Sequence, residues 1–277
     1  MKIGYNGMTA IKKSNFMLDL ECAEKYGFDS LEPRMSILDD HIAAGGSIEQ
    51  IVEFFASHRI KPDAMNSLEF FNNRPKDIYS DKLCEFTRMC KAAHIIGSRS
   101  VIVVPSYDID ESFSEIVKNT AACLDDLCGI AADYSIDVAF EFVGFKRFSI
   151  NTLAGAMEVI GRVKKSNIGL VIDLYHFYIN GSDLTDIEKL DSSKLLMVHL
   201  DDAEDFPVGS FNDDVHRVLP GDGVIQYGDI FTALRKIGYD GTFSVELFNE
   251  KLWEMNPENA ISLSKKKADE VMAKYWK

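Results

Sequence analysis

The feature that most constrains this sequence is a regular alternation of short apolar runs with longer amphipathic stretches of helical spacing. The apolar runs predict buried strands, and the stretches between them predict helices that cover a parallel sheet. The eight predicted strands span residues 2–6, 30–34, 63–68, 100–106, 137–143, 168–174, 195–201 and 242–248. The predicted helices span residues 15–26, 47–58, 81–96, 111–134, 152–163, 227–237 and 257–275, with a short one near 183–190. Eight such units without a low-complexity linker indicate an α/β fold, a (β/α)8 TIM barrel that forms a single domain over residues 1–277.

The charge balance argues against two classes of partner. Aspartate and glutamate number 44 against 30 lysines and arginines, which gives a formal net charge of −14. A field of this sign repels the phosphates of nucleic acids and anionic lipid surfaces. No run approaches the ~20 apolar residues of a membrane span, and the first residues lack the apolar region of a signal peptide. We therefore expect a cytoplasmic protein that acts on a small molecule, with no nucleic-acid or membrane partner; the sequence leaves the oligomeric state open.

Ionisable residues recur near the ends of four consecutive predicted strands. Each is embedded late in an otherwise apolar run, and the four are Glu141, Asp173, His199 and Glu246. Reacting groups of TIM barrels lie where strands end and the following loops begin. Any one of these residues could be an isolated polar group at a strand end, but their coincidence on four successive strands favours a shared site.

A bound cation would explain this set of residues. Three carboxylates and an imidazole buried together repel one another in a low dielectric unless a positive charge compensates them. Three oxygen donors and one nitrogen suit one divalent metal ion, and Mn²⁺, Zn²⁺, Co²⁺ and Mg²⁺ all tolerate such ligands. The sequence predicts a metal site without choosing among these ions.

Two further residues follow the same strands and could assist a metal-bound substrate. His176 comes three residues after Asp173, and Arg217 follows the seventh strand. Both can donate hydrogen bonds to a developing oxyanion. The alternatives are a loop histidine with its own protein partners and an arginine paired with Asp213 or Asp214.

Taken together, these residues resemble the xylose isomerase-like superfamily of sugar isomerases and epimerases. Three segments, at residues 70–74, 199–209 and 244–248, resemble more narrowly the inosose (2-keto-myo-inositol) isomerases of inositol catabolism. The resemblance implies that Glu141, Asp173, His199 and Glu246 ligate the ion and that His176 and Arg217 face the substrate. It also implies that the substrate is a polyhydroxylated ring ketone or a ketose, which nothing in the residues alone indicates.

The expected reaction moves a carbonyl to the adjacent carbon through a cis-enediolate. Glu141 and Glu246 are the expected acid and base, and the sequence does not decide which of them acts first. A hydride shift between the same carbons is the alternative mechanism. Within the superfamily, a ketose 3-epimerase, a hydroxypyruvate-type isomerase and an inosose dehydratase have similar metal sites.

Polar contacts to the substrate are expected from the loops after the first three strands. The candidates are Asn6, Glu32 and Asn66, with Phe71, Phe206 and Trp253 as walls of the pocket. Residues of these types are also common as loop caps and in the core.

A nuclease related to abasic-site endonucleases is the alternative from another class. The resemblance implies that such an enzyme needs extra histidines at the ends of the third and fourth strands. This chain has Asn66, Leu68, Pro105 and Ser106 there, and its negative charge opposes DNA binding. A barrel that binds sugars without converting them is a third possibility.

Overall fold

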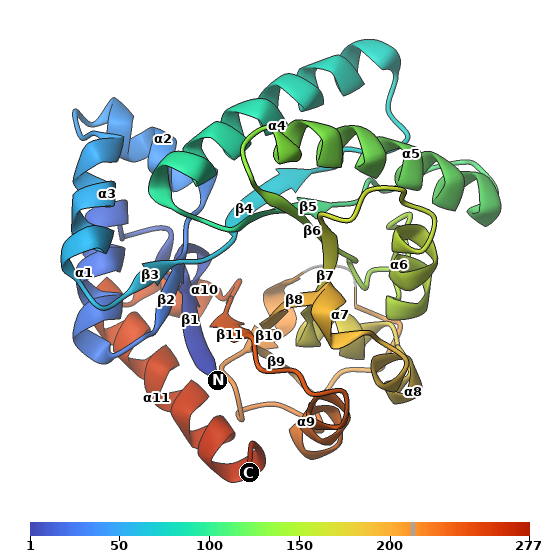
Figure 1. Ribbon diagram of the computed structural model, residues 1–277. Helices are drawn as coiled ribbons and strands as arrows, with labels where there is room; N and C mark the ends of the chain where they lie inside the picture. The colour runs from blue at the N-terminus through green and yellow to red at the C-terminus, as the bar shows by residue number, and fades with distance from the viewer. Residues whose placement is uncertain (212–213) are drawn as a thin grey trace.

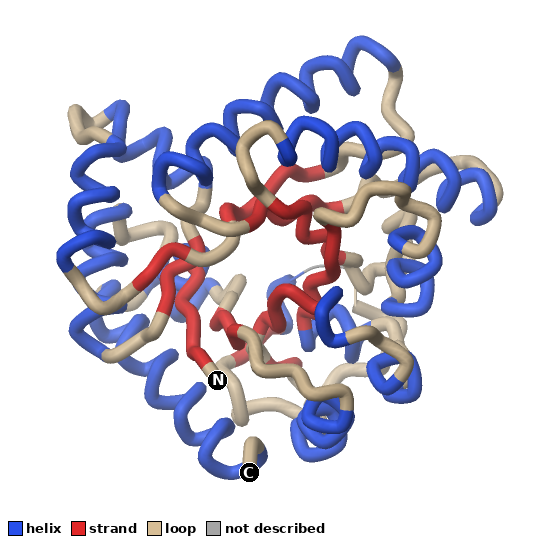
Figure 2. Tube along the Cα trace, viewed as in Figure 1, coloured by secondary structure: helices blue, strands red, loops and turns tan. Residues whose placement is uncertain are grey.

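The computed structural model describes residues 1–211 and 214–277, in which a ring of parallel strands is surrounded by helices (Figures 1 and 2). Nine strands of this part form one sheet: β1 (Lys2–Asn6), β2 (Ser30–Glu32), β3 (Lys61–Pro62), β4 (Met65–Glu69), β5 (Ser100–Val104), β6 (Asp137–Glu141), β7 (Ile168–Asp173), β8 (Leu195–His199) and β11 (Thr242–Val245). The first strand, β1, pairs in parallel with the last, β11, and with β2.

The third position of the barrel is divided between β3 and β4. Strand β3 pairs with β2, and β4 pairs with β5 on the other side. The ring closes through a parallel bridge between Arg34, just after β2, and Asn66 in β4. The backbone N–H of Asn66 donates to the Pro33 carbonyl there at 2.8 Å. Eight positions around the ring correspond to the eight predicted strands, and the TIM-barrel prediction is confirmed.

Helices cover the outside of the ring. They are α1 (Phe16–Tyr26), α2 (Met35–Ala43), α3 (Ile48–Ser57), α4 (Lys76–Ile96), α5 (Phe113–Ala132), α6 (Leu153–Ile160), α7 (Leu174–Ile179), α8 (Leu184–Glu188), α9 (Tyr227–Lys236), α10 (Glu250–Glu254) and α11 (Pro257–Tyr275). Polar N-caps fix several starts, as where the Ser47 side chain accepts from Gln50 and the Gln50 side chain accepts in return. The sequence did not predict α2, α7 and α10, which are all short; α2 and α10 bury few residues, whereas α7 directly continues the buried strand β7.

Two short strands and three 3₁₀ helices complete the described secondary structure. Strands β9 (Asp202–Ala203) and β10 (Arg217–Val218) form an antiparallel pair beyond the end of β8. The 3₁₀ helices are η1 (Gly7–Ala10), η2 (Ser192–Lys194) and η3 (Asp214–His216). The β9–β10 pair matters for the site because it places Arg217 above the barrel.

The interior of the barrel explains why particular side chains reach its end. A small apolar layer fills the ring, formed by Ala64, Ile102, Ala139, Val171 and Met197. Side chains two positions apart on a strand share a face. The residues two positions after Ala139, Val171 and Met197 therefore point into the ring one layer higher, and they are Glu141, Asp173 and His199.

Two further observations concern the chain as a whole. Within residues 1–211 and 214–277, no helix combines the length and the apolar character that a bilayer crossing requires. All five cysteines are free thiols, three of them buried.

Candidate metal centre and substrate cavity

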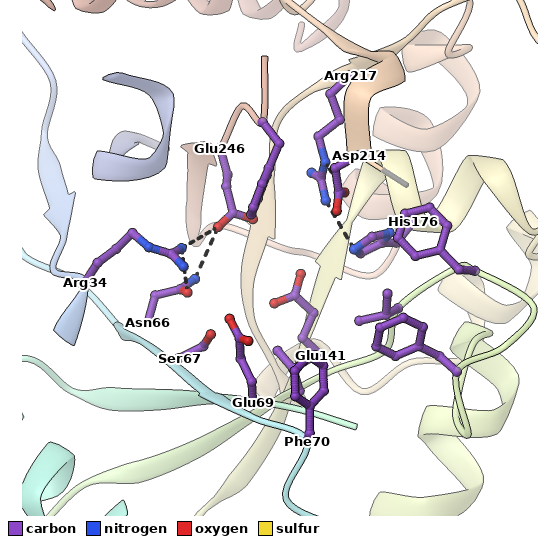
Figure 3. Close-up of a pocket in the computed structure, with 15 residues that line it drawn as sticks. Arg34, Asn66, Ser67, Glu69, Phe70, Glu141, His176, Asp214, Arg217 and Glu246 are labelled. Carbon is purple, nitrogen blue, oxygen red and sulfur yellow. Dashed lines mark hydrogen bonds and ion pairs between the residues drawn. The ribbon is translucent and has the colours of Figure 1, made fainter. Parts of the chain in front are cut away.

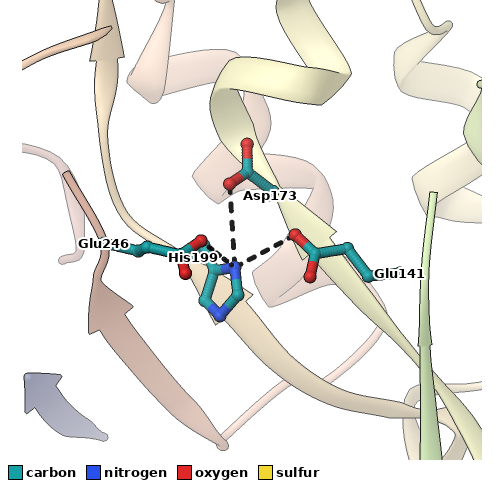
Figure 4. Close-up of side chains that lie close together, drawn as sticks. All are labelled: Glu141, Asp173, His199 and Glu246. Carbon is teal, nitrogen blue, oxygen red and sulfur yellow. Dashed lines mark hydrogen bonds and ion pairs between the residues drawn. The ribbon is translucent and has the colours of Figure 1, made fainter. Parts of the chain in front are cut away.

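Four ionisable side chains converge at the carboxyl-terminal end of the barrel (Figure 4). Glu141, Asp173 and His199 end β6, β7 and β8, and Glu246 directly follows β11. All four are buried, and one potential ligand atom from each lies within 4.8 Å of the others. The structure thus brings together the four residues that the sequence singled out, in an arrangement that could hold a metal ion; we call them the quartet.

The imidazole of His199 is oriented toward the three carboxylates of the quartet. Its Nδ1 atom lies 3.2 Å from Glu141 Oε1, 3.2 Å from Glu246 Oε2 and 3.6 Å from Asp173 Oδ2. Its Nε2 atom, on the opposite edge of the imidazole, lies 3.2 Å from Glu32 Oε2. Nδ1 is therefore the atom that His199 can offer to a cation, while Nε2–H donates to Glu32.

Glu32 lies behind the quartet and is not among the residues that line the cavity. Its Oε1 accepts hydrogen bonds from Asn6 Nδ2 and Asn66 Nδ2, both at 2.6 Å. Asn6 also donates to Glu246 Oε1 at 3.0 Å. A carboxylate in this position fixes the tautomer and the ring direction of a ligating histidine. Asn6 and Glu32, which we expected to touch the substrate, are completely buried behind the quartet, because their side chains point into the barrel below the cavity.

The electrostatics of the quartet favour a cation. Burial opposes its charge, yet the Glu246, Glu32 and Glu141 carboxylates raise the pKa of His199 well above its usual value. Burial also raises the pKa of Glu246 to about 7, with the Glu141 and Glu32 carboxylates adding to the shift. Protons are thus retained where negative charge accumulates. A divalent cation can replace them, and the oxygen and nitrogen donors present fit such an ion.

Arg217 connects the quartet to further acidic groups. Its NH1 donates to Asp173 Oδ2 at 2.6 Å and also to Asp201, and its Nε donates to Asp214 Oδ1 at 2.8 Å. Burial disfavours the charge of Asp173, but the Arg217 guanidinium holds the pKa of Asp173 well below its usual value. The ion pair with Asp214 that the sequence left open is present, whereas Asp213 lies outside the described residues.

His176 lies against Arg217 and retains an unused donor. Arg217 NH2 is 3.1 Å from His176 Nε2, and because arginine can only donate, Nε2 accepts and the proton resides on Nδ1. Burial lowers the pKa of His176, as does Arg217, although Asp173 opposes the shift. Among the described residues, Nδ1 has no hydrogen-bond partner. A neutral His176 therefore has a buried N–H group without a partner among the described residues.

A cavity of about 230 Å³ opens above the quartet (Figure 3). It is lined by Arg34, Asn66, Ser67, Glu69, Phe70, Val104, Glu141, Val143, Phe145, Phe148, His176, Asp214, Arg217, Glu246 and Phe248. Its volume lies somewhat below the usual range for sites of drug-sized ligands, which suits one small ring. Phenylalanines and two valines supply its apolar walls, and charged side chains with Asn66 and Ser67 supply the remainder, a combination that fits a molecule with apolar faces and a hydroxylated edge.

The other predicted substrate contacts have different positions. Asn66 lines the cavity, as expected, and also accepts from Arg34 NH1 at 2.8 Å. Phe71 is completely buried in the core, where its ring meets Phe140 edge-on, so it is not a wall of the cavity. Phe206 stacks on His216 and remains 38% exposed.

Trp253 is likewise absent from the cavity lining. Its Nε1 donates to the Met8 carbonyl at 2.7 Å, which anchors α10 to the loop after β1. An aromatic residue near the active end of a barrel could equally line a pocket or join two neighbouring segments of the chain. Sequence position alone does not separate these roles.

Arg34 and Glu69 line the cavity and were missed in the sequence. Arg34 NH1 donates to Glu246 Oε1 at 3.1 Å, and Glu69 ends β4. The signal that could have revealed both was the one that revealed the quartet, an ionisable residue where a strand ends.

Gly144 makes the position of His176 sensitive to a single methyl group. A Cβ on Gly144 would lie 2.3 Å from the His176 carbonyl oxygen, which is backbone and cannot turn away. We expect Gly144→Ala to lower the free energy of unfolding by about 1–3 kcal/mol in urea denaturation. Gly129→Ala is the matched control, because nothing lies within 4 Å of that position on α5 and alanine favours a helix by about 0.5–1 kcal/mol. Equal destabilisation by both substitutions would contradict the close contact.

Comparisons with known proteins agree with this geometry. Residues 20–269 match the family described as xylose isomerase-like TIM barrel. The inosose isomerase of Halalkalibacterium halodurans is 38% identical over 100% of this chain and 98% of its own length, and that of Bacillus subtilis is 36% identical over 100% and 99%. The crystal structure of the IolI protein with a bound zinc atom superposes with a TM-score of 0.95 at 36% identity, covering 99% of both chains. The chain belongs to the xylose isomerase-like TIM barrel family.

Proposed function

We propose that this protein is a cytoplasmic, metal-dependent inosose isomerase that moves a carbonyl between adjacent carbons of a polyhydroxylated ring ketone in inositol catabolism. The observation that carries the proposal is the quartet beside the 230 Å³ cavity, with four potential ligand atoms within 4.8 Å of one another. The inosose isomerases and the zinc-containing structure similar to this chain support it.

Glu141, Asp173, His199 and Glu246 would hold one divalent ion, of which zinc is the first choice because the similar IolI structure contains it. When bound, the ion supplies a Lewis acid that polarises the carbonyl and acidifies the adjacent C–H bond. The protein must then move two protons, one between the two neighbouring carbons and one from the hydroxyl to the former carbonyl oxygen, and stabilise the enediolate between these steps. Its side chains supply both functions.

The two glutamates of the quartet differ in their free oxygen atoms. Glu246 Oε1 already accepts from Asn6 at 3.0 Å, Arg34 at 3.1 Å and Asn66 at 3.4 Å. Glu141 Oε1 faces His199, and its Oε2 accepts no hydrogen bond from the described residues. We therefore assign both proton transfers at carbon to Glu141 Oε2, which removes the proton from one carbon and then delivers it to the neighbouring carbon. Glu246 would act as a ligand of the ion.

This assignment favours isomerisation over epimerisation. Carbonyl migration through a cis-enediolate requires one base on one face of the ring, whereas inversion of a centre requires proton delivery to the opposite face. The side chains of His176 and Arg217 line the cavity, and their positive or polar N–H groups would stabilise the oxygens that gain charge.

The test is NMR of zinc-loaded protein with a panel of inososes and free ketoses in D2O. We expect the carbonyl of an inosose to move to an adjacent carbon, with deuterium incorporated at the carbon that receives the proton. Removal of the metal by a chelator should abolish turnover, and adding Zn²⁺, Mn²⁺, Co²⁺ or Mg²⁺ should show which ion restores it. An inverted centre without carbonyl movement, or loss of water, would replace the proposal with an epimerase or a dehydratase. Complete retention of substrate hydrogen would indicate a hydride shift.

A further inference from the structure

The cavity wall formed by β2 and β4 carries a carboxylate that the proposed chemistry does not use. Glu69 lies at the end of β4, is exposed, and accepts no hydrogen bond or ion pair from the described residues. Figure 3 shows its carboxylate directed into the cavity, on the same side as Arg34 and Asn66 and across from His176 and Arg217. Glu69 is also three positions from Asn66 in sequence and is separate from the quartet.

The local backbone explains why this wall is so polar. The register between β4 and β5 shifts between Met65 and Leu68, so the strict alternation of side chains is interrupted there. Asn66, Ser67 and Glu69 all line the cavity as a result. Across the cavity, the ring of Phe145 packs edge-on against His176 and offers no hydrogen bond.

A second cavity of about 370 Å³ adjoins the first and shares Arg34, Asn66, Ser67, Glu69 and Phe70 with it. Its remaining charged side chains are largely paired with one another, as in the Arg88–Asp39 and Lys82–Glu85 ion pairs at 2.6 and 2.8 Å. Glu69 stands at the junction without such a pair. Its oxygens, which no described residue occupies, are therefore available to a molecule bound in the first cavity.

We propose that Glu69 is a specificity-determining residue that accepts hydrogen bonds from a substrate hydroxyl remote from the reacting carbons. This inference rests on the proposed function and adds to it. A carboxylate accepts from a hydroxyl more strongly than a neutral group does. The same charge, close to the carboxylates of the quartet, disfavours a substrate bearing phosphate or carboxylate at that edge. Glu69 thus selects an uncharged polyol.

Glu69 also offers a cleaner test than its neighbour Arg34. Arg34 donates to Glu246, so its replacement would disturb a member of the quartet as well as the cavity. Glu69 touches no member of the quartet through a hydrogen bond or ion pair. Substitutions at Glu69 should leave zinc content and folding unchanged, which zinc analysis and urea denaturation can verify independently of turnover.

The experiment compares Glu69→Gln and Glu69→Leu with the parent protein, using the full inosose and a set of analogues that each lack one hydroxyl. Glu85→Gln is the matched control, since Glu85 lines only the second cavity and loses the same charge. We expect Glu69→Leu to raise KM for the full inosose about 10- to 100-fold with little change in kcat, and Glu69→Gln to have a smaller effect. Glu85→Gln should behave like the parent.

One deoxy analogue should show where Glu69 acts. The parent should bind that analogue about as weakly as Glu69→Leu binds the full inosose, and Glu69→Leu should lose nothing further on it. Unchanged KM in Glu69→Leu, or an equal penalty on every analogue, would overturn the role of Glu69 while leaving the isomerase intact. Failure of the parent to convert any inosose would overturn the proposed function and this inference with it.

Discussion

Zinc-loaded Glu141→Gln protein is expected to convert an inosose about 10²- to 10⁴-fold more slowly than the zinc-loaded parent, because a positioned acid or base contributes this much. The glutamine amide keeps an oxygen near His199 Nδ1, where Glu141 Oε1 now lies at 3.2 Å. It cannot take up the proton that we assign to Oε2. Steady-state kinetics at saturating substrate, with zinc content measured on the same sample, separates loss of the base from loss of the metal.

Glu158→Gln is the control for this substitution. Glu158 pairs with Arg162 at 2.7 Å on the exposed side of α6, where each side chain is 45% exposed. This variant should keep kcat within twofold of the parent. If Glu141→Gln retained zinc and also turned over within a few-fold of the parent, the assignment of the proton to Glu141 would be wrong.

Arg217→Met is expected to lower the free energy of unfolding by about 3–5 kcal/mol, since removing one partner of a buried ion pair leaves an uncompensated charge. The Arg217 side chain is 1% exposed, and it donates to Asp173 and Asp201, which are fully buried. Its guanidinium also lies 4.7 Å from the centre of the Tyr175 ring, a cation–π contact that methionine cannot replace. Denaturation in urea at neutral pH, with the metal removed from both proteins, measures the difference.

Arg162→Met removes an arginine of equal size from an exposed ion pair and should cost at most about 1 kcal/mol. A similar small effect for Arg217→Met would mean that Asp173 and Asp201 are compensated without the arginine. Arg217→Met should also lose activity, since Arg217 holds Asp173 and contacts His176.

The position of the site could be predicted because periodicity and strand ends are both local properties of a sequence. An apolar run that ends in one ionisable residue predicts a strand and also which end of the barrel that residue occupies, as it did for Asp173 and His199. The depth of a side chain depends on neighbours that are remote in sequence. Glu32 and Asn66 illustrate this: they share a hydrogen bond, yet one lies behind the quartet and the other lines the cavity.

Other differences arise from irregular backbone and short elements. The register of β4 shifts between Met65 and Leu68, and Asn66, Ser67 and Glu69 all line the cavity. Strict alternation would have placed Asn66 on one face of the strand and Ser67 and Glu69 on the other. Helix α2 follows the strand-ending Pro33 and buries only Ile37 and Leu38, so its periodic signal is weak. Phe71 follows β4 in the sequence, where a residue could either line the pocket or enter the core. Its edge-on packing against Phe140 places it in the core, and this contact is not visible in the sequence.

The pairing of β1 with β11 means that the metal centre depends on contacts between the two ends of the chain. Glu246 is held by Asn6 and Arg34, which lie 240 and 212 positions earlier in the sequence. During synthesis on the ribosome, a growing chain therefore exposes three potential ligands and their supporting carboxylate well before the fourth arrives. Full metal affinity should develop only after the final strand has emerged and the ring has closed, so ion capture would report on closure of the barrel.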